Sequence, residues 1–325
     1  MKSALPAYKA QLATLVDEAP TGDAWLHELK YDGYRIGCAI ERGKVRLESR
    51  RGNDWTAQFP EVVAAAERLP VERALLDGEV AVVTDSGQTS FQALQNAFSG
   101  SAREGLTYFV FDLLHLDGKN LAAAPLVERK RELERLLRRV KAPTLKYSAH
   151  IEGDGPEVFA RACKLGAEGI VSKRRDQPYR PGRNSAWLKI KCVQRQEFVV
   201  GGFTDPEGSR QGIGALLIGY YDRKKQLIFA GKVGTGRGFT AKFTSELRAE
   251  LNKLEQRESP FTPVPPKSAV QRAHWVRPER VVEVAFAEWT QGGNVRHGSV
   301  LGLRSDKRAH EVRRERPRGP RGSLR

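Results

Sequence analysis

The chain has 325 residues, of which 40% are hydrophobic and 29% charged, and its formal net charge is +16. This size favours two domains, and this composition is that of an ordinary folded protein. No stretch approaches the roughly 18 apolar residues of a membrane span, and no apolar leader follows Met1, so we expect a cytoplasmic protein that does not enter a membrane. The charge indicates a polyanionic partner, although ribosome-associated, membrane-surface and nucleotide-handling proteins share this balance.

The first part of the chain, expected to form a domain over residues 1–195, mixes short strands and helices. Strands are expected at 25–30, 34–40, 45–48, 74–83, 107–113, 169–173 and 186–192, and helices at 60–69, 126–140 and 156–165. Leucines recur along 126–140 at the spacing of an amphipathic helix. Because strands and helices do not alternate strictly, we expect an α+β domain and not a doubly wound parallel sheet.

A second domain is expected over residues 196–307, after a polar run at 194–196. Its strands are expected at 197–203, 213–221, 227–234, 280–288 and 295–303, with one helix at 241–255. Five strands with one helix among them predict a small β-barrel of the OB type. The proline-rich segment 258–278 is expected to be a loop, and the basic segment 308–325 a disordered tail.

The three cysteines are Cys38, Cys163 and Cys192, and no two of them form a Cys-x-x-Cys pair. We therefore expect neither a disulfide framework nor a structural zinc site. All three are interpreted as small buried apolar residues.

A candidate nucleophile lies in residues 28–35, Glu-Leu-Lys-Tyr-Asp-Gly-Tyr-Arg. Lys30 follows an expected strand, and the Asp-Gly turn can present its amine at the edge of a sheet. A lysine amine attacks only when neutral, and with a pKa near 10.4 roughly 0.04% is neutral at pH 7. We expect burial and a neighbouring cation such as Arg35 to lower this pKa. Taken alone, the pattern also fits a surface turn.

Six further blocks follow Lys30 in order. They are 49–52 (Ser-Arg-Arg-Gly), 76–79 (Leu-Asp-Gly-Glu), 108–112 (Tyr-Phe-Val-Phe-Asp), 168–174 (Glu-Gly-Ile-Val-Ser-Lys-Arg), 187–191 (Trp-Leu-Lys-Ile-Lys) and a last block from Arg296-His297 to 301–307 (Leu-Gly-Leu-Arg-Ser-Asp-Lys). This series resembles the covalent nucleotidyltransferase superfamily of DNA ligases, RNA ligases and mRNA-capping enzymes. It is most similar to the ligase domain of bacterial ligase D, the end-joining ligase, over about residues 5 to 308.

The resemblance implies a fold and a set of roles. It implies an α+β nucleotidyltransferase domain, with ATP-grasp-like antiparallel sheets and helices, followed by an OB-fold β-barrel. Lys30 matches the family's adenylated nucleophile, and Glu28 matches a residue beside the nucleotide. Arg183 resembles a phosphate-contacting arginine. Arg304 and Lys307, with the aspartate between them, match the motif that orients the leaving pyrophosphate.

The cations of the first domain fit phosphoryl transfer, which needs charge neutralisation and positioning more than acid–base chemistry. Lys189 and Lys191 alternate on an expected strand, so both face one side, where they can hold the α-phosphate of ATP. Arg35 and Arg50 offer forked donors to phosphate or ribose.

The acidic and aromatic residues complete the expected ATP and metal site. Glu79 can accept from a ribose hydroxyl, and Glu79 and Glu168 are the expected ligands of a divalent metal, Mg or Mn. Phe111 can stack on adenine, with Phe109 on the same strand face as the second choice. The alternatives are surface ion pairs for the two glutamates and plain core packing for the two phenylalanines.

The resemblance implies an ATP-dependent DNA ligase that seals nicks in three steps. Lys30 attacks the α-phosphate of ATP, AMP passes to a DNA 5′-phosphate, and the 3′-hydroxyl displaces AMP. The implied partner is nicked double-stranded DNA, with Ku suggested by the resemblance. A monomeric, nucleoid-associated bacterial enzyme of DNA repair, recombination or non-homologous end joining is expected. Since 29 residues precede Lys30, we expect no helical DNA-binding domain, and no polymerase or phosphoesterase domain.

Other activities stay open at this point. An RNA ligase or another polynucleotide 5′-end nucleotidyltransferase fits the same lysine, and a capping enzyme would use GTP. An NAD-dependent ligase is disfavoured because that family carries a four-cysteine zinc site. A basic OB-fold protein that only binds nucleic acid explains the charge but not the blocks up to residue 191.

Overall fold

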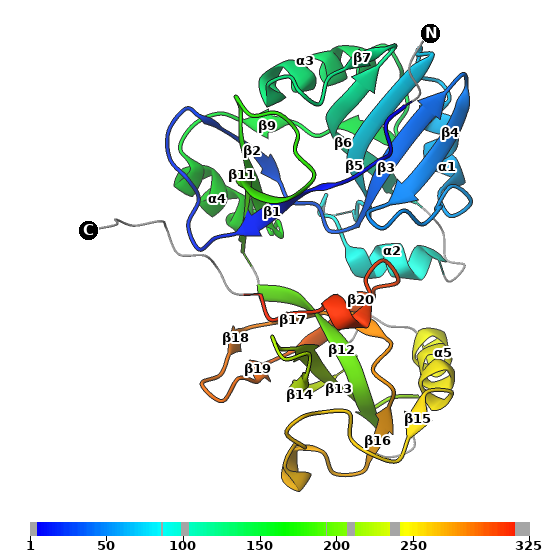
Figure 1. Cartoon of the computed structure of the whole chain (residues 1–325), viewed down its shortest axis with the longest axis vertical. Helices are drawn as coiled ribbons and strands as arrows, with labels where there is room; N and C mark the ends of the chain where they lie inside the picture. The colour runs from blue at the N-terminus through cyan, green and yellow to red at the C-terminus, as the bar shows by residue number, and fades with distance from the viewer. Residues whose placement is uncertain are drawn as a thin grey trace. The chain divides into compact units, whose positions relative to one another are not determined.

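The computed structural model describes residues 5–85, 87–98, 104–192, 194–206, 212–234 and 241–315 (Figure 1). As far as it is described, the chain forms two compact units. Unit 1 comprises Met1–Leu94 and Ala102–Cys192, and unit 2 comprises Val193–Glu315 with Gln95–Ser101. Among the described residues, no helix is both long and apolar enough to cross a membrane.

The first sheet of unit 1 has six strands in the order β4-β3-β5-β6-β7, with β8 pairing to β6. All neighbours are antiparallel except β6 and β8. The strands are β3 (Tyr34–Glu41), β4 (Lys44–Ser49), β5 (Arg73–Val82), β6 (Leu106–Leu116), β7 (Lys119–Asn120) and β8 (Leu145–Tyr147). The long central strands β5 and β6 carry most of the buried apolar side chains of this sheet.

The second sheet of unit 1 has five strands in the order β1-β11-β10-β2-β9. They are β1 (Gln11–Leu15), β2 (Trp25–Leu29), β9 (His150–Ile151), β10 (Gly169–Arg174) and β11 (Gly182–Lys191). β1 and β11 are parallel, whereas β10 is antiparallel to both of its neighbours. Val171 pairs with Glu28 on one side and with Lys189 on the other, so these three side chains share one face of the sheet.

The two sheets meet through a hydrophobic cluster that includes Leu75 and Phe111 from the first sheet and Trp187 from the second. The opposite face of the second sheet is covered by α4, whose Val158 and Ala162 pack with Ile170 and Ile190. One face of the second sheet is therefore directed at the first sheet, and the candidate site lies there.

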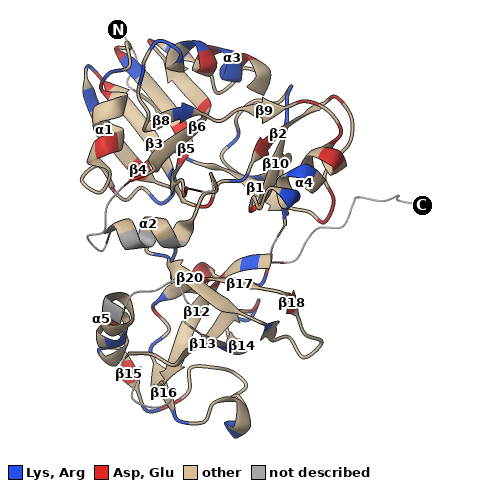
Figure 2. Cartoon of the chain, turned by 180° about the vertical axis from the view of Figure 1, so that it is seen from behind, with Lys and Arg blue, Asp and Glu red and all other residues tan. Residues whose placement is uncertain are grey.

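In the part of unit 1 that the structure describes, the helices that belong to it wholly or partly are α1 (Pro60–Ala66), α2 (Phe91–Phe98), α3 (Leu126–Leu137) and α4 (Gly155–Lys164). Asp154 caps α4 by accepting from the backbone N–H of Glu157. The leucines of α3 are buried on one face, and exposed Glu–Arg pairs lie away from it. Figure 2 shows the acidic residues of this helix in red and its basic residues in blue.

Unit 2 is a closed five-stranded barrel. Its strands are β12 (Gln194–Thr204), β13 (Ala215–Tyr221), β14 (Leu227–Gly234), β17 (Val281–Phe286) and β20 (Ser299–Leu303). Around the barrel they follow the order β12-β13-β14-β20-β17, and β17 closes onto β12. Among the described strands of the barrel, only β14 and β20 are parallel, and α5 (Ala241–Asn252) lies between the third and fourth strands in sequence. This is the OB topology, so the expected α+β domain followed by an OB barrel is confirmed.

Several local expectations are wrong. β1 and α2 were not expected, and the segment 258–278 is not entirely a loop, because it contains a 3-10 turn (η1, Lys267–Ala269) and β16 (Ala273–Val276). β16 pairs with β12 and with the short β15 (Glu255–Gln256). The expected last strand is divided into β19 (Val295–Arg296), which forms a hairpin with β18 (Glu288–Trp289), and β20.

The basic tail expected from residue 308 is not disordered in its first part. Residues 309–311 form a 3-10 turn (η2), and Val312 is fully buried in a cluster of unit 2. The backbone N–H of Tyr221 donates to the carbonyl of Val312 at 2.9 Å. One apolar residue within a basic segment anchors it to the barrel, and residues 316–325 lie outside the described residues.

The cysteines divide into two kinds. Cys38 is free and fully buried, as expected. Cys163 of α4 and Cys192, directly after β11, form a disulfide, so their interpretation as separate apolar residues is wrong. Their separation of 29 residues gives no local signal, because the pairing arises from α4 packing on the second sheet.

Candidate active site

Lys30 lies directly after the end of β2, an inner strand of the second sheet. Its backbone N–H donates to the carbonyl of Gly169, and its Nζ donates to Oε2 of Glu168 at 2.5 Å. The Lys30 side chain is 24% exposed, whereas that of Glu168 is 3% exposed. Two glycines make this geometry possible: a Cβ on Gly33 would lie 2.1 Å from the carbonyl oxygen of Val80, and one on Gly169 would lie 2.0 Å from that of Ile190.

The protonation of Lys30 differs from the sequence expectation. Burial acts to lower the pKa of Lys30, but Glu168, and then Glu79 and Asp32, outweigh burial and raise it above its ordinary value. The expected lowering by Arg35 is wrong, because Arg35 is ion-paired elsewhere and carboxylates surround the amine. Without a nucleotide, Lys30 is therefore an ammonium held by Glu168.

Arg35 of β3 is bound to a buried carboxylate. Its Nε and Nη2 donate to the two oxygens of Asp77 at 2.8 and 2.6 Å. The hydroxyls of Tyr8 and Tyr179 each donate to Asp77 at 2.7 Å. Burial acts to lower the pKa of Arg35, but Asp77 raises it, so the guanidinium is fixed and charged. Two of its forked donors are thus engaged within the protein and not directed at a ligand.

Glu28 of β2 is also held by cations. Its Oε1 accepts from Nζ of Lys130 at 2.7 Å, and its Oε2 accepts from Oγ of Ser148 at 2.9 Å. Nζ of Lys173 lies 3.0 Å from Oε2. Burial acts to raise the pKa of Glu28, but Lys130 and Lys173 lower it below its ordinary value. Burial in turn lowers the pKa of Lys173 to about 8.

Phe111 and Phe109 share one face of β6 but have different surroundings. Phe111 is 8% exposed, and Lys173 Nζ and Arg35 Cζ lie 4.2 and 4.8 Å from its ring centroid. Phe109 is half-buried and stacks on Tyr31, with ring centroids 4.0 Å apart. Phe111 thus has core contacts on this face, as the alternative interpretation predicts, but it is also the ring beside the two cations.

The remaining expected residues of unit 1 are only partly brought together. Lys189 and Lys191 are half-buried on β11, on the same face as Glu28. Glu79 shares a face of β5 with Asp77, and its carboxylate contributes to the raised pKa of Lys30. Arg50 is half-buried in the turn after β4.

Arg183 does not join this group. It is exposed at the opposite end of β11 and donates to the carbonyl of Ala13. Six residues of strand, or roughly 20 Å, separate it from Lys189.

In unit 2, the two expected cations are ion-paired with carboxylates of the same barrel. Arg304 donates to Asp306 at 2.8 Å and to Glu283 at 2.7 Å. Nζ of Lys307 lies 2.9 Å from Glu197. Burial acts to lower the pKa of Arg304, but Asp306 and Glu283 raise it. Arg304 therefore connects two carboxylates of the barrel in addition to any role with a ligand, whereas the ammonium of Lys307 is paired with Glu197.

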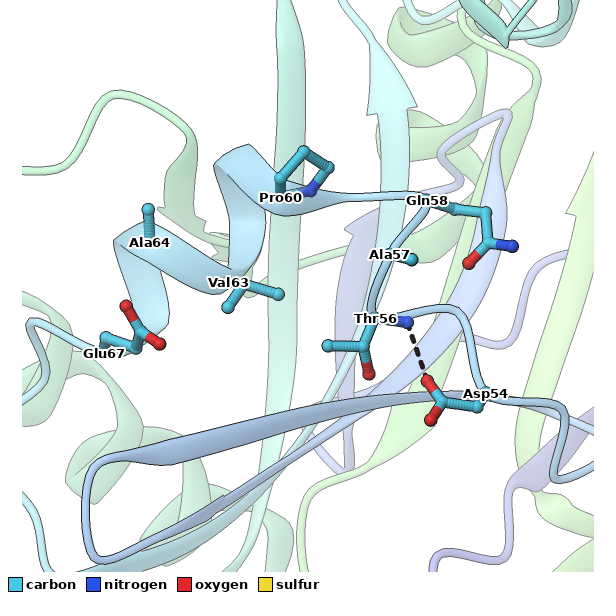
Figure 3. Close-up of a pocket in the computed structure, with 8 residues that line it drawn as sticks. All are labelled: Asp54, Thr56, Ala57, Gln58, Pro60, Val63, Ala64 and Glu67. Atoms are coloured by element: carbon cyan, nitrogen blue, oxygen red, sulfur yellow. Dashed lines mark hydrogen bonds between the residues drawn. The ribbon is translucent and has the colours of Figure 1, made fainter.

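A pocket beside α1 is separate from all of these residues (Figure 3). It is lined by Asp54, Thr56, Ala57, Gln58, Pro60, Val63, Ala64 and Glu67. In Figure 3, Asp54 accepts from the backbone N–H of Thr56, so this carboxylate closes its own loop. No expected site residue contributes to the pocket.

The carboxylates near Lys30 fit a divalent cation that is also bound by phosphate. Within the described ranges, no group of three or more His, Cys, Asp or Glu side chains is arranged to hold a metal ion. Glu168 and Glu79 both stabilise one positive charge, the ammonium of Lys30, since each of them raises its pKa. Mg²⁺ commonly uses one or two carboxylates together with phosphate oxygens and water, and this donor set is compatible with it.

Sequence reasoning missed Lys130, Ser148, Tyr8 and Tyr179, which hold the carboxylates of Glu28 and Asp77. Their partners lie 69 to 120 residues away in sequence. The leucine spacing of α3 predicts which side of the helix is buried, but Lys130 is a buried cation on that helix, and no local signal identifies its partner.

Comparison with known proteins gives two family matches along the chain. The family described as "ATP dependent DNA ligase domain" matches residues 7–191, and "ATP dependent DNA ligase C terminal region" matches residues 209–307. The first match covers more than half of the chain.

Individual relatives agree with these matches. "Multifunctional non-homologous end joining protein LigD" of Pseudomonas aeruginosa is 44% identical over 322 residues, covering 98% of this chain and 38% of that protein. A "DNA ligase" of Thermococcus fumicolans is 30% identical over 329 residues, covering 93% of this chain and 56% of that protein. The chain thus spans less than two thirds of the length of these relatives. The solved structure "mycobacterial DNA ligase D complexed with ATP and MES" is 36% identical with a TM-score of 0.68, covering 94% of this chain and 98% of that one. The chain therefore belongs to the ATP-dependent DNA ligase family.

Proposed function

We propose that this chain seals nicks in double-stranded DNA through a covalent lysyl-AMP on Lys30, in DNA repair or non-homologous end joining. The observation that carries the proposal is the placement of Lys30, which lies at the end of β2, partly exposed and hydrogen-bonded to the buried Glu168. The family match and the relative named for end joining support the reaction and its setting.

In the first step, the Nζ of Lys30 forms a bond to the α-phosphorus of ATP, and the bond to pyrophosphate breaks. Lys30 must first lose a proton, since Glu168 keeps it as an ammonium. Lys189 and Lys191 are proposed to neutralise the α-phosphate, and their position on the sheet face shared with Glu28 supports this role. Arg50 is proposed to bind phosphate or ribose. Arg35 is proposed to be held in position by its ion pair with Asp77.

The nucleoside is proposed to lie against the first sheet. Phe111 is the proposed stacking ring, with Phe109 as the alternative on the same strand face. Glu28 is proposed to contact the base, and Glu79 to accept from a ribose hydroxyl. Support comes from Lys173, which lies against both Glu28 and the ring of Phe111.

Glu79 and Glu168 would hold a divalent metal, Mg or Mn, that neutralises charge on the phosphates. Positive charge placed at Glu168 would also weaken its hold on the ammonium of Lys30. Arg304 and Lys307 of unit 2 are proposed to orient the leaving pyrophosphate. We further propose nicked DNA as the substrate, Ku as a partner, and a monomer in the bacterial cytoplasm at the nucleoid, by analogy with the family.

The test uses Lys30→Ala. This variant should not become labelled by radioactive ATP, yet it should still close a nick that already carries 5′-AMP, since the last step needs no lysine nucleophile. Labelling is followed on denaturing gels, and closure by strand length. An ATP label on a different residue of the variant would refute Lys30 as the nucleophile. Labelling of wild type by GTP and not ATP would favour a capping enzyme instead.

A further inference from the structure

We propose that Lys130 of α3 is a positioning residue that makes the site selective for adenine, by holding the Glu28 carboxylate ionised and in one orientation. This inference rests on the proposed function and assigns a role to a residue that lies in none of the seven sequence motifs. Lys130 is proposed to act through Glu28, without touching the nucleotide.

The contacts of Lys130 fix both oxygens of the carboxylate. Its Nζ donates to Glu28 Oε1 at 2.7 Å and to the carbonyl of Ser148 at 2.9 Å. Ser148 in turn donates from Oγ to Glu28 Oε2, and its backbone N–H is bound to the carbonyl of Val110. Rotating the carboxylate would therefore break a hydrogen bond on either oxygen. The orientation of Glu28 is therefore fixed by α3 through Lys130 and by β6 through Ser148.

Burial makes this lysine costly unless it has a specific use. Lys130 is 1% exposed, and Glu28 is 3% exposed. Lysine is almost never this buried without a partner, and a buried ion pair often adds no more stability than apolar side chains of similar volume. An unbranched apolar side chain at residue 130 would pack beside the buried leucines of α3. The presence of a cation at this position is explained by its effect on Glu28, because it favours the ionised form of the carboxylate.

The carboxylate is connected to the proposed base site by Lys173. Its Nζ lies 3.0 Å from Glu28 Oε2 and 4.2 Å from the ring centroid of Phe111. A base that reaches this ring therefore meets the Glu28–Lys173 pair at its edge. Three groups contact the Glu28 carboxylate: Lys173 from β10, Lys130 from α3, and Ser148 from the segment after β8.

An ionised carboxylate discriminates between purines by hydrogen-bond polarity. It can only accept, so it pairs with the 6-amino group of adenine and repels the 6-keto oxygen of hypoxanthine or guanine. Without Lys130, Lys173 would be the one remaining cation of the described residues beside Glu28 to oppose the effect of burial, so the carboxyl would take up a proton more readily. The O–H of a protonated carboxyl can donate to a 6-keto oxygen. Loss of Lys130 should thus relax selectivity and not simply reduce binding.

The experiment compares the rates at which ATP and inosine triphosphate label Lys30, at equal concentrations and with the full chain. Because both rates come from one preparation, their ratio does not depend on the folded fraction. In Lys130→Met the preference for ATP should fall by about tenfold, the effect of one charge-assisted hydrogen bond. Ser148→Ala keeps the lysine and should lower the preference in the same direction by less. It decides the question if Lys130→Met does not fold.

The matched control is Arg129→Met. Arg129 is the neighbouring buried cation of α3, and it pairs with Asp112 at 2.7 and 2.9 Å. Its loss should lower the melting temperature but leave the nucleotide ratio at the wild-type value. In a Glu28→Gln background, adding Lys130→Met should change the ratio no further, because the carboxylate through which it acts is gone.

An unchanged ratio in both Lys130→Met and Ser148→Ala would overturn the proposal, and so would an equal shift in Arg129→Met. Failure of the proposed function gives a different result, since wild type would then be labelled by neither nucleotide. Wild-type labelling by ATP with unaltered selectivity in the variants would remove only the role of Lys130.

Discussion

At the scale of single residues, the Lys30–Glu168 pair determines how reactive the lysine is before ATP binds. Glu168 raises the pKa of Lys30, so Glu168→Gln should lower it and increase the neutral fraction at pH 8 to 9. The partly exposed amine should then react several-fold faster with a small amine-directed acylating reagent in the absence of nucleotide. Peptide mapping of the modified lysine measures this rate.

The control for this prediction is Glu197→Gln, which removes the carboxylate of another lysine pair, with Lys307. It should leave acylation of Lys30 unchanged. If Glu168→Gln slowed acylation of Lys30, Glu168 would be assisting deprotonation in the free protein and not opposing it.

A second residue-scale prediction concerns His274, which lies between two carboxylates on unit 2. Its ring nitrogens are 3.0 Å from Asp205 and 2.8 Å from Glu255, and these contacts, Asp205 first, raise its pKa. A raised pKa gives stability that is fully present below the ordinary value near 6.5 and lost as pH rises through the folded value. His274 is 31% exposed, so about 1 kcal/mol is expected.

The measurement is chemical unfolding of wild type and His274→Gln at pH 6 and pH 9. The difference in unfolding free energy should be larger at pH 6. A larger difference at pH 9 would mean that stacking of the neutral ring on Phe203, with centroids 4.8 Å apart, dominates over its charge.

Residues and elements were predictable from the sequence to different degrees. The order of the blocks predicted Lys30, Glu168 and Lys189 as site residues. In the structure, Lys30 is hydrogen-bonded to Glu168, and Lys189 lies on the sheet face that it shares with Glu28. The order of the blocks could not identify the partners of Glu28 or Arg35, since those contacts join segments 102 and 42 residues apart. The short β16 was missed for a similar reason, because its pairing with β12 and not its proline-rich sequence makes it a strand.

At the scale of elements, the disulfide between Cys163 and Cys192 ties α4 to the end of β11, next to Lys191. The backbone N–H of Cys192 also donates to the carbonyl of Glu168 at 2.9 Å. A link that closes a loop of this length stabilises a fold by about 2–4 kcal/mol, mainly by restricting the unfolded chain. Cys163→Ser should therefore lower the unfolding free energy of unit 1 by about this amount.

Unfolding of oxidised and reduced protein provides the measurement. Reductant should destabilise wild type and have no effect on Cys163→Ser, while Cys38→Ser should keep the full redox dependence because Cys38 is free. Equal stability of oxidised and reduced wild type would show that packing of α4 on the second sheet, and not the covalent link, holds this region.

At the scale of the whole molecule, the proposed first step needs groups from both units, because Lys30 belongs to unit 1 and Lys307 to unit 2. If Lys307 orients the leaving pyrophosphate, unit 2 has to close over the nucleotide during that step, a common kind of gating. Lys307→Ala should then reduce ATP labelling of Lys30 far more than it reduces closure of a pre-adenylated nick. Arg304→Ala should show the same order of losses, with an added loss of barrel stability because Arg304 binds Asp306 and Glu283.

The ion pair between Lys307 and Glu197 allows a structural role to be separated from a chemical one. Glu197→Gln breaks the same pair but keeps the cation. If Lys307 acts on pyrophosphate, Glu197→Gln should label Lys30 at close to the wild-type rate while Lys307→Ala does not. Equal losses in labelling and in nick closure for Lys307→Ala would assign this lysine to DNA binding or to the barrel itself, and the closure of unit 2 over ATP would have to be abandoned.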